Sequence, residues 1–175
     1  MTESRTFAER YDLLAQAVAA CERITAEAMP EPYRELLVHA SHMTVTLETY
    51  FRQSVMVEVL QSLVDGDEYG RQILLRLQDS GRVVQFGVVQ INLNVLPPHV
   101  REEIISERTP LGRVLIQNGV LTRVEPMAYL ALNANADFAK WFSVAVGTKL
   151  YGRIGVIFAG DEAAIEVLEV LAPIG

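Results

Sequence analysis

Arg71 and Glu169 are the side chains best placed for chemistry, because each falls on the apolar side of a predicted strand. Side chains alternate between the two faces of a strand, so Arg71 shares a face with Ile73 and Leu75, and Glu169 with Val167. A charge on an inward face is unfavourable unless it is paired or hydrogen-bonded. Two interpretations therefore stay open: strand-end or ion-paired structural residues, or a pocket in which Arg71 binds an anion and Glu169 meets a polar group.

Two backbone features could complete such a pocket. Gly87 lies inside the strand that follows the strand of Arg71, and a missing side chain there lets a ligand approach the backbone. The run Thr109-Pro110-Leu111-Gly112-Arg113 is typical of a helix start, with Thr109 as the cap and Pro110 at the first helical position. Free N–H groups at such a start suit a carboxylate or phosphate. A capped short helix also accounts for this run without any ligand.

Other catalytic and metal-binding patterns are weak. The chain has no Gly-x-Ser-x-Gly motif and no Gly-rich phosphate loop after a strand, and its one cysteine, Cys21, falls in a predicted helix. His39 and His42 are three residues apart and could share a helix face, but no pattern completes a metal site, so capping or core hydrogen bonding is expected. We expect no metal and no organic cofactor, and any enzyme built this way would rely on positioning and electrostatics.

The composition is that of an ordinary globular protein. Of the 175 residues, 50% are hydrophobic and 21% are charged. The net charge of −7 disfavours nucleic acid and anionic membranes, so an anionic ligand would need a local arginine. The single cysteine fits a reducing compartment, and neither a signal peptide nor a membrane-spanning run is evident. We expect one cytoplasmic domain over residues 1–175, without nucleic-acid or membrane partners; the oligomeric state is not determined.

The elements that must position these residues change in kind along the chain. Apolar spacing predicts helices over residues 5–28, 33–38, 47–51, 97–105 and 135–142. Strands are predicted from residue 54, over 71–78 and 82–93, over 120–133 with Pro126 as a break or edge position, and as a final hairpin around Gly160-Asp161-Glu162. Helices followed by hairpin-linked strands predict an α+β fold with a largely antiparallel sheet.

Short motifs follow one another in a characteristic order along most of the chain. In sequence order they are Leu36-Leu37, Met43-Thr44, Leu47-Glu48, Arg71–Leu75, Gly87, Thr109–Arg113, Leu121–Arg123, Leu150–Arg153 and Glu169. Together they resemble the chorismate–pyruvate lyase (4-hydroxybenzoate synthase) family and its relatives. The resemblance implies a chorismate lyase-like α+β fold, with a mostly antiparallel sheet of about six strands that helices cover around a buried pocket.

The resemblance also implies an activity and roles for individual residues. The activity is the cofactor-free elimination that converts chorismate to 4-hydroxybenzoate and pyruvate, a carbon–oxygen lyase step of the kind found in ubiquinone biosynthesis. Arg71 and Glu169 would be the catalytic residues, one as a carboxylate clamp and the other as a proton donor at the ring hydroxyl or ether oxygen. The substrate-binding residues would be Arg71, Met43 beside the ring, the backbone at Leu111, and Gly87.

The chain departs from this family at positions that carry positive charge. Val88 follows the strand glycine where characterised lyases have arginine, and residues 154–156 lack the further arginines found there. Arg76, Arg123 or Arg153 could substitute, although alternation points Arg76 to the other face. Two alternatives therefore remain: a non-catalytic aromatic-acid (effector) binding domain, as attached to some transcription regulators, or a lyase for a related hydroxylated acid. In each case the expected partner is a small aromatic or cyclic carboxylic acid.

Overall fold

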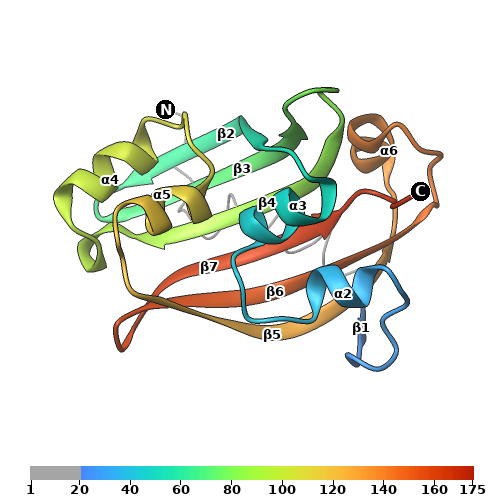
Figure 1. Ribbon diagram of the computed structural model, residues 1–175, viewed down its shortest axis with the longest axis horizontal. Coiled ribbons are helices and arrows are strands. Elements are labelled where there is room, and N and C mark those ends of the chain that lie inside the picture. Colours follow the sequence, from blue (N-terminus) through green and yellow to red (C-terminus); the bar gives the residue numbers. More distant parts are fainter. Residues whose placement is uncertain (1–20) are drawn as a thin grey trace, which may run out of the picture.

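The computed structural model describes residues 21–175, and the strands among them form one antiparallel sheet (Figure 1). The strands are β1 (Glu22–Ile24), β2 (Val55–Asp65), β3 (Glu68–Leu77), β4 (Val83–Asn92), β5 (Thr122–Asn133), β6 (Lys149–Ala159) and β7 (Glu162–Leu171). Their order across the sheet is β1-β5-β6-β7-β4-β3-β2, and every neighbouring pair is antiparallel. The predicted α+β class and antiparallel sheet are confirmed. The described residues contain seven strands rather than about six, because β1 adds a short edge.

The helices lie mainly on one face of this sheet. They are α2 (Tyr33–Leu37), α3 (Met43–Phe51), α4 (Pro98–Ile105), α5 (Leu111–Gln117) and α6 (Ala136–Phe142), with a 3-10 turn, η1, at Leu93–Val95. Figure 1 shows α2, α3, α4 and α5 across the front of the sheet and α6 at one end. None of the described helices is long and apolar enough to span a membrane.

The end of the helix predicted over residues 5–28 is the main error among the predicted elements that the described residues test. Residues 5–20 lie outside the described part of the chain, whereas residues 22–24 form β1, which pairs with residues 129–131 of β5. Pairing with a sheet edge overrides the local helical pattern there. The predicted break at Pro126 is confirmed as an irregularity, because the register of β5 against β6 shifts between Pro126 and Ala128.

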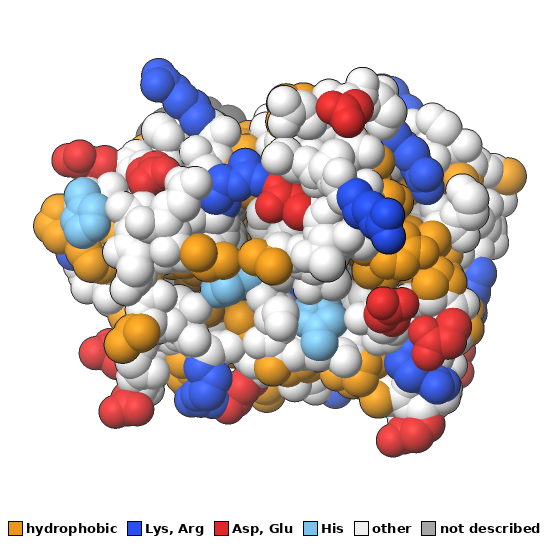
Figure 2. All heavy atoms as spheres, viewed as in Figure 1, with side chains coloured by type: hydrophobic (Ala, Val, Ile, Leu, Met, Phe, Trp, Pro, Cys, Tyr) orange, Lys and Arg blue, Asp and Glu red, His pale blue; other side chains and the backbone are white. Residues whose placement is uncertain are grey.

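Two apolar clusters fill the space between the sheet and the front helices. Under α4 and α5, one cluster gathers around Val89 and Ile165. Under α2 and α3, the other gathers around Ile73 and Leu171. Acidic and basic side chains are interspersed over the outside of this helix-covered face (Figure 2), so its surface does not carry a large patch of one charge. The charges that could select a ligand are therefore the buried ones on the sheet beneath.

A third apolar cluster covers the opposite face of the sheet. There α6 packs on β4, and the ring of Trp141 stacks on Phe86 with 4.9 Å between centroids. The ring of Phe138 meets the Phe86 ring edge-on, with 5.3 Å between centroids. Asn135 caps α6 by accepting a hydrogen bond from the Phe138 N–H at 2.9 Å, which fixes the helix start. This face is closed by aromatic packing, so the polar cavity lies on the other side.

Gly152 determines how closely β6 approaches β7 beside Glu169. A Cβ at Gly152 would lie 2.5 Å from the Glu169 carbonyl oxygen, which real Cβ atoms essentially never do. We expect Gly152→Ala to lower the free energy of unfolding by about 1–3 kcal/mol through overpacking, measured by urea denaturation. Gly155→Ala is the matched control on the same strand, because its Cβ would lie 3.3 Å from a backbone oxygen and should cost less. A fully stable Gly152→Ala protein would contradict this close approach.

Candidate ligand-binding site

Three neighbouring strands, β3, β4 and β7, form the floor of a cavity beneath the front helices. Their registers align the inward-facing residues in three rows: Arg71, Val89 and Val167; then Ile73, Gly87 and Glu169; then Leu75, Gln85 and Leu171. Arg71 and Glu169 thus share the apolar face that alternation predicted. Gly87 sits between Ile73 and Glu169, so the middle row lacks a side chain at its centre.

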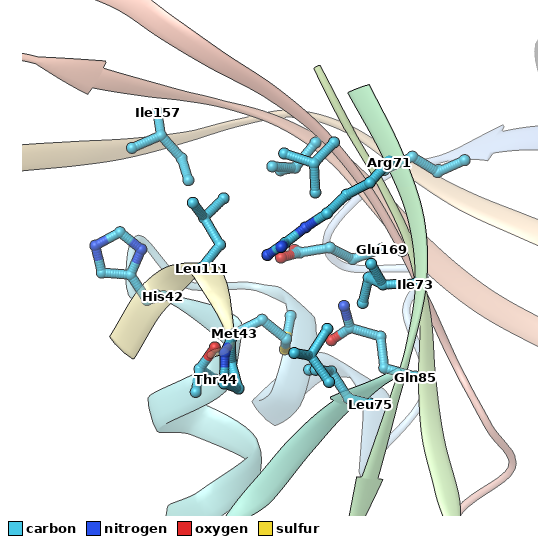
Figure 3. Close-up of a pocket in the computed structure, with 17 residues that line it drawn as sticks. His42, Met43, Thr44, Arg71, Ile73, Leu75, Gln85, Leu111, Ile157 and Glu169 are labelled. Atoms are coloured by element: carbon cyan, nitrogen blue, oxygen red, sulfur yellow. The ribbon is translucent and has the colours of Figure 1, made fainter. Parts of the chain in front are cut away.

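A cavity of about 50 Å³ lies above this floor (Figure 3). It is walled by His42 and Thr44 near the start of α3 and by Gly112 at the start of α5. All five residues predicted for the site line it: Met43, Arg71, Gly87, Leu111 and Glu169. At roughly 10–15 Å³ for each water molecule, the space holds on the order of four waters. In this form it suits a compact ligand rather than a large cofactor.

Arg71 is a buried cation with spare hydrogen-bonding capacity. The side chain is 1% exposed, and no carboxylate among the described residues lies within ion-pair distance of its guanidinium. Its Nη1 is a long 3.4 Å from the Ile104 carbonyl oxygen, and its Nε has no hydrogen-bond partner within the described structure. Burying an under-satisfied guanidinium is unfavourable, so an anion in the cavity would be favoured.

The neighbour of Arg71 on the same strand cannot supply that anion. The Tyr69 hydroxyl donates a hydrogen bond of 2.8 Å to Glu107. Burial, together with this bond to the carboxylate, raises the pKa of Tyr69 to about 12. The adjacent Arg71 guanidinium lowers the pKa of Tyr69 in part, but Tyr69 stays neutral at ordinary pH and does not neutralise the charge of Arg71.

Glu169 is held by an arginine on the next strand, which corrects its expected role. Arg153 on β6 lies directly opposite Glu169 in the register, and its Nε donates to Glu169 Oε2 at 2.6 Å. Arg153 is 1% exposed and Glu169 9%, so both charges are buried and each compensates the other. Glu169 is therefore an ion-paired carboxylate, which is the structural interpretation that strand alternation left open, rather than an unpaired proton donor.

Arg153 also ties the segment between α2 and α3 to the sheet. Its Nη1 donates to the carbonyl oxygens of Leu37 at 3.2 Å and His39 at 2.8 Å, and its Nη2 to that of Ser41 at 3.1 Å. This segment leads directly into the wall of the cavity, so Arg153 positions that wall. Sequence reasoning named Arg153 only as a substitute cation. The predicted hairpin at Gly160 brings strands β6 and β7 together, but a one-residue register shift decides which residues face each other.

The other two candidate cations lie away from the cavity. As alternation predicted, Arg76 points to the opposite face, where it pairs with Glu58. Arg123 is more than half exposed and lies over the ring of Phe158, 4.2 Å from its centroid. Of the three possible substitutes, only Arg153 contacts a residue of the site.

His39 and His42 are engaged in separate hydrogen bonds, which confirms the predicted core hydrogen bonding. His39 Nε2 lies 2.7 Å from the Leu36 carbonyl oxygen, and His42 Nε2 lies 2.8 Å from Thr122 Oγ1. Burial lowers the pKa of His39, and the nearby charge of Arg153 lowers it further. Burial likewise lowers the pKa of His42. Both shifts favour the neutral imidazole in the folded protein.

The Thr109–Arg113 run begins α5, but it is capped differently from the prediction. The helix starts at Leu111 and its N-cap is Pro110, without a side-chain capping bond. Because Pro110 keeps an extended ψ of 140°, Thr109 lies two positions before the helix and does not cap it. The first N–H groups of a helix have no hydrogen-bond partner within the helix. Leu111, the first residue of α5, lines the cavity.

The last two residues of this run fasten α5 to α3. A Cβ at Gly112 would lie 3.0 Å from Thr44 Oγ1, so the missing side chain permits the close contact of the two helices. Arg113 forms an ion pair with Glu48 of α3, and Glu48 also accepts the Val55 N–H at 3.0 Å. Arg113 therefore takes part in a helix–helix ion pair and does not line the cavity.

Comparison with solved structures finds similar folds at low sequence identity. PhnF from Mycobacterium smegmatis aligns with a TM-score of 0.59 and 13% identity, over 94% of this chain and 83% of that chain. The ligand-binding domain of a putative GntR-family transcriptional regulator from Bordetella bronchiseptica aligns with a TM-score of 0.51 and 14% identity, over 68% and 85%. No family model matches the sequence. A comparison with curated proteins found no match.

These likenesses identify the fold as the chorismate lyase-like fold of such regulator domains, and they correct the expected function. The expected conversion of chorismate to 4-hydroxybenzoate and pyruvate is contradicted, because one of these fold neighbours is the ligand-binding domain of a putative transcriptional regulator. The expected lyase class and its link to ubiquinone-type biosynthesis are wrong for the same reason. Exclusion of nucleic-acid partners is also unsupported, since one neighbour comes from a transcriptional regulator.

Breaking the pair between Arg153 and Glu169 should strongly destabilise the protein. Arg153→Met leaves the Glu169 carboxylate buried without its partner, so the free energy of unfolding should fall by about 3–5 kcal/mol in urea denaturation. Adding Glu169→Leu to Arg153→Met should recover part of this loss. Arg76→Met is the control, because its partly exposed pair should contribute no more than about 1 kcal/mol. Equal stability of the two arginine variants would contradict a structural role for the buried pair.

The two neutral histidines predict a loss of stability in mildly acidic solution. Their folded pKa values lie below the ordinary 6.5, so the unfolded chain takes up protons first as the pH falls. The resulting stabilisation is complete above about pH 6.5 and declines as the pH falls towards the folded pKa values. Between pH 7.5 and 5.5, His42→Gln should show a smaller fall in unfolding free energy than wild type. His99→Gln, at an exposed position of α4, should behave as wild type. If the unfolding free energy of His42→Gln fell as much as that of wild type, the acid sensitivity would not come from His42.

Proposed function

We propose that this chain is a non-catalytic binding domain for a small organic acid, with the acid carboxylate held by Arg71 in the cavity. The observation that carries the proposal is the buried Arg71 guanidinium, which lines the cavity with an unpartnered Nε and no carboxylate at ion-pair distance within the described part of the chain. The likeness to a regulator's ligand-binding domain supports binding over turnover. This is the effector-domain alternative that the sequence left open.

The cavity contains suitable partners for an acid besides Arg71. A buried guanidinium binds a carboxylate strongly, and preferably through two parallel hydrogen bonds. The first N–H groups of α5, at Leu111, would add donors, while Met43 and the open position at Gly87 would receive the carbon skeleton. The net charge of −7 does not attract anions, so the acid would have to be selected by these residues of the cavity.

The size of the cavity bears on which acid is bound. About 50 Å³ suits a compact acid directly. An aromatic or cyclic acid, the finer form of the proposal, would have to part α3 and α5 slightly. Such a movement would loosen the close approach at Gly112 and the ion pair between Arg113 and Glu48.

A regulatory role follows if ligand occupancy alters contacts with a partner. Glu169 lines the cavity, and Arg153 connects it to the carbonyl groups of the segment between α2 and α3. An acid that moved Glu169 would therefore change how Arg153 holds that segment. Coupling between two sites requires such a difference in contacts between the bound and the free state. We propose that this domain works in the cytoplasm and reports acid binding to a partner protein or domain.

Isothermal titration calorimetry with acetate, propanoate, cyclohexanecarboxylate and benzoate tests the binding proposal. We expect at least one of these acids to bind wild type, and Arg71→Met to weaken that binding by roughly 10- to 100-fold, as loss of a charged hydrogen-bonding partner predicts. Arg76→Met is the matched control, because Arg76 lies on the same strand but on the opposite face. Arg71→Lys should bind with intermediate affinity, since it keeps the charge without the bidentate geometry.

Two results would contradict the proposal. If no acid binds, or if folded Arg71→Met keeps the wild-type affinity, the carboxylate is not held by Arg71. Incubation with chorismate tests the non-catalytic part separately, because pyruvate release above the spontaneous rate would show turnover. Circular dichroism and thermal unfolding verify that each variant is folded before its affinity is interpreted.

A further inference from the structure

Gln85 is a second buried polar residue on the cavity floor with an unsatisfied group. The residue is 4% exposed, and its Oε1 has no hydrogen-bond partner within the described structure. Buried side-chain oxygens are nearly always paired, so this exception needs a physical reason. Gln85 lines the same cavity as Arg71, and Figure 3 shows its amide directed towards the space beneath Arg71 and Glu169.

The place of Gln85 in the sheet sets it apart from Arg71. Gln85 lies in the third row of the floor, Arg71 in the first, and Gly87 in the row between them. A Cβ at Gly87 would lie 3.2 Å from Gln85 Nε2 and 3.1 Å from Ile73 Cδ1. The absent side chain therefore leaves the amide open to the middle of the cavity, where a ligand's carbon skeleton would lie.

We infer that Gln85 recognises a hydroxyl group of the bound acid, so that the ligand is a hydroxy acid whose hydroxyl is remote from its carboxylate. This inference rests on the proposed function, in which Arg71 holds the carboxylate. A hydroxyl group donates one hydrogen bond and accepts others, so it can donate to Oε1 and accept from Nε2 of one amide. A second carboxylate cannot donate to Oε1, and an ammonium group cannot accept from Nε2.

The arrangement of the rows specifies where the hydroxyl belongs on the ligand. A carboxylate at Arg71 and a hydroxyl at Gln85 are separated by the row that contains Gly87. A 2-hydroxy acid, with its two polar groups on adjacent carbons, cannot reach across that row. The site should therefore favour a distal hydroxyl over one next to the carboxylate.

Calorimetry with two matched sets of acids tests this inference. The sets are propanoate with its 2-hydroxy and 3-hydroxy derivatives, and benzoate with its 2-hydroxy and 4-hydroxy derivatives. In wild type, we expect the distal hydroxy acid to bind about tenfold more tightly than the parent acid, because it satisfies the amide, and the 2-hydroxy acid to gain nothing. Gln85→Leu should bind the parent acid at least as well as wild type and lose the preference for the distal hydroxyl.

Two further measurements test whether the Gln85 amide itself produces this preference. Gln90→Leu removes an amide on the same strand but on the opposite face of the sheet, where Gln90 Nε2 donates to Glu68, and it should keep the wild-type preference. Because Oε1 has no partner to lose in the described structure, Gln85→Leu should also leave the thermal unfolding temperature of the ligand-free protein unchanged or higher. A large decrease would reveal a structural partner for Gln85 and overturn the inference.

The remaining outcomes distinguish this inference from the proposed function. Acids that bind in an Arg71-dependent manner with no hydroxyl preference would overturn the role of Gln85 and leave the proposed function standing. A preference that persists in Gln85→Leu, or disappears in Gln90→Leu, would likewise mean that the Gln85 amide does not recognise the hydroxyl. If no acid binds wild type, the proposed function and this inference both fail.

Discussion

The buried ion pair between Arg153 and Glu169 is the interaction on which the candidate site depends. Two charges removed from water require each other, and the 2.6 Å contact across β6 and β7 supplies this compensation. Arg153 then uses its remaining donors on carbonyl oxygens of the segment between α2 and α3, including that of His39. One guanidinium thus holds the sheet, the site carboxylate and the helical wall in a single arrangement.

With Arg153 satisfied in this way, the polar groups left over define what the cavity can bind. Arg71 and Gln85 are buried at opposite ends of the floor, and each has an atom without a hydrogen-bond partner in the described structure. Unsatisfied groups lower stability in the empty protein, so a ligand that satisfies both would bind by removing that cost. The same architecture leaves Glu169 engaged in structure, which agrees with a binding domain better than with an acid catalyst.

Much of this arrangement could be predicted from the order of residues. Period-two alternation correctly placed Arg71 and Glu169 on the inward face, and turn residues located the hairpins that pair their strands. The helical prediction for residues 22–24 and the Thr109 cap were wrong, because edge pairing of β1 and the extended backbone at Pro110 are settled by neighbouring elements. Motif resemblance indicated the fold correctly but suggested a reaction that the fold alone does not determine.

By itself, the sequence determined that Arg71 and Glu169 lie on the apolar face of their strands, because alternation is a local property of regular extended backbone. The tertiary structure alone decided which residues face each other. The hairpin of β6 and β7 starts with Ala159 opposite Glu162, a register that would set Arg153 against Leu168. An irregularity between Ile157 and Phe158 shifts the pairing by one residue and brings Arg153 opposite Glu169. The central ion pair therefore depends on strand pairing and on this irregularity, which no local pattern encodes.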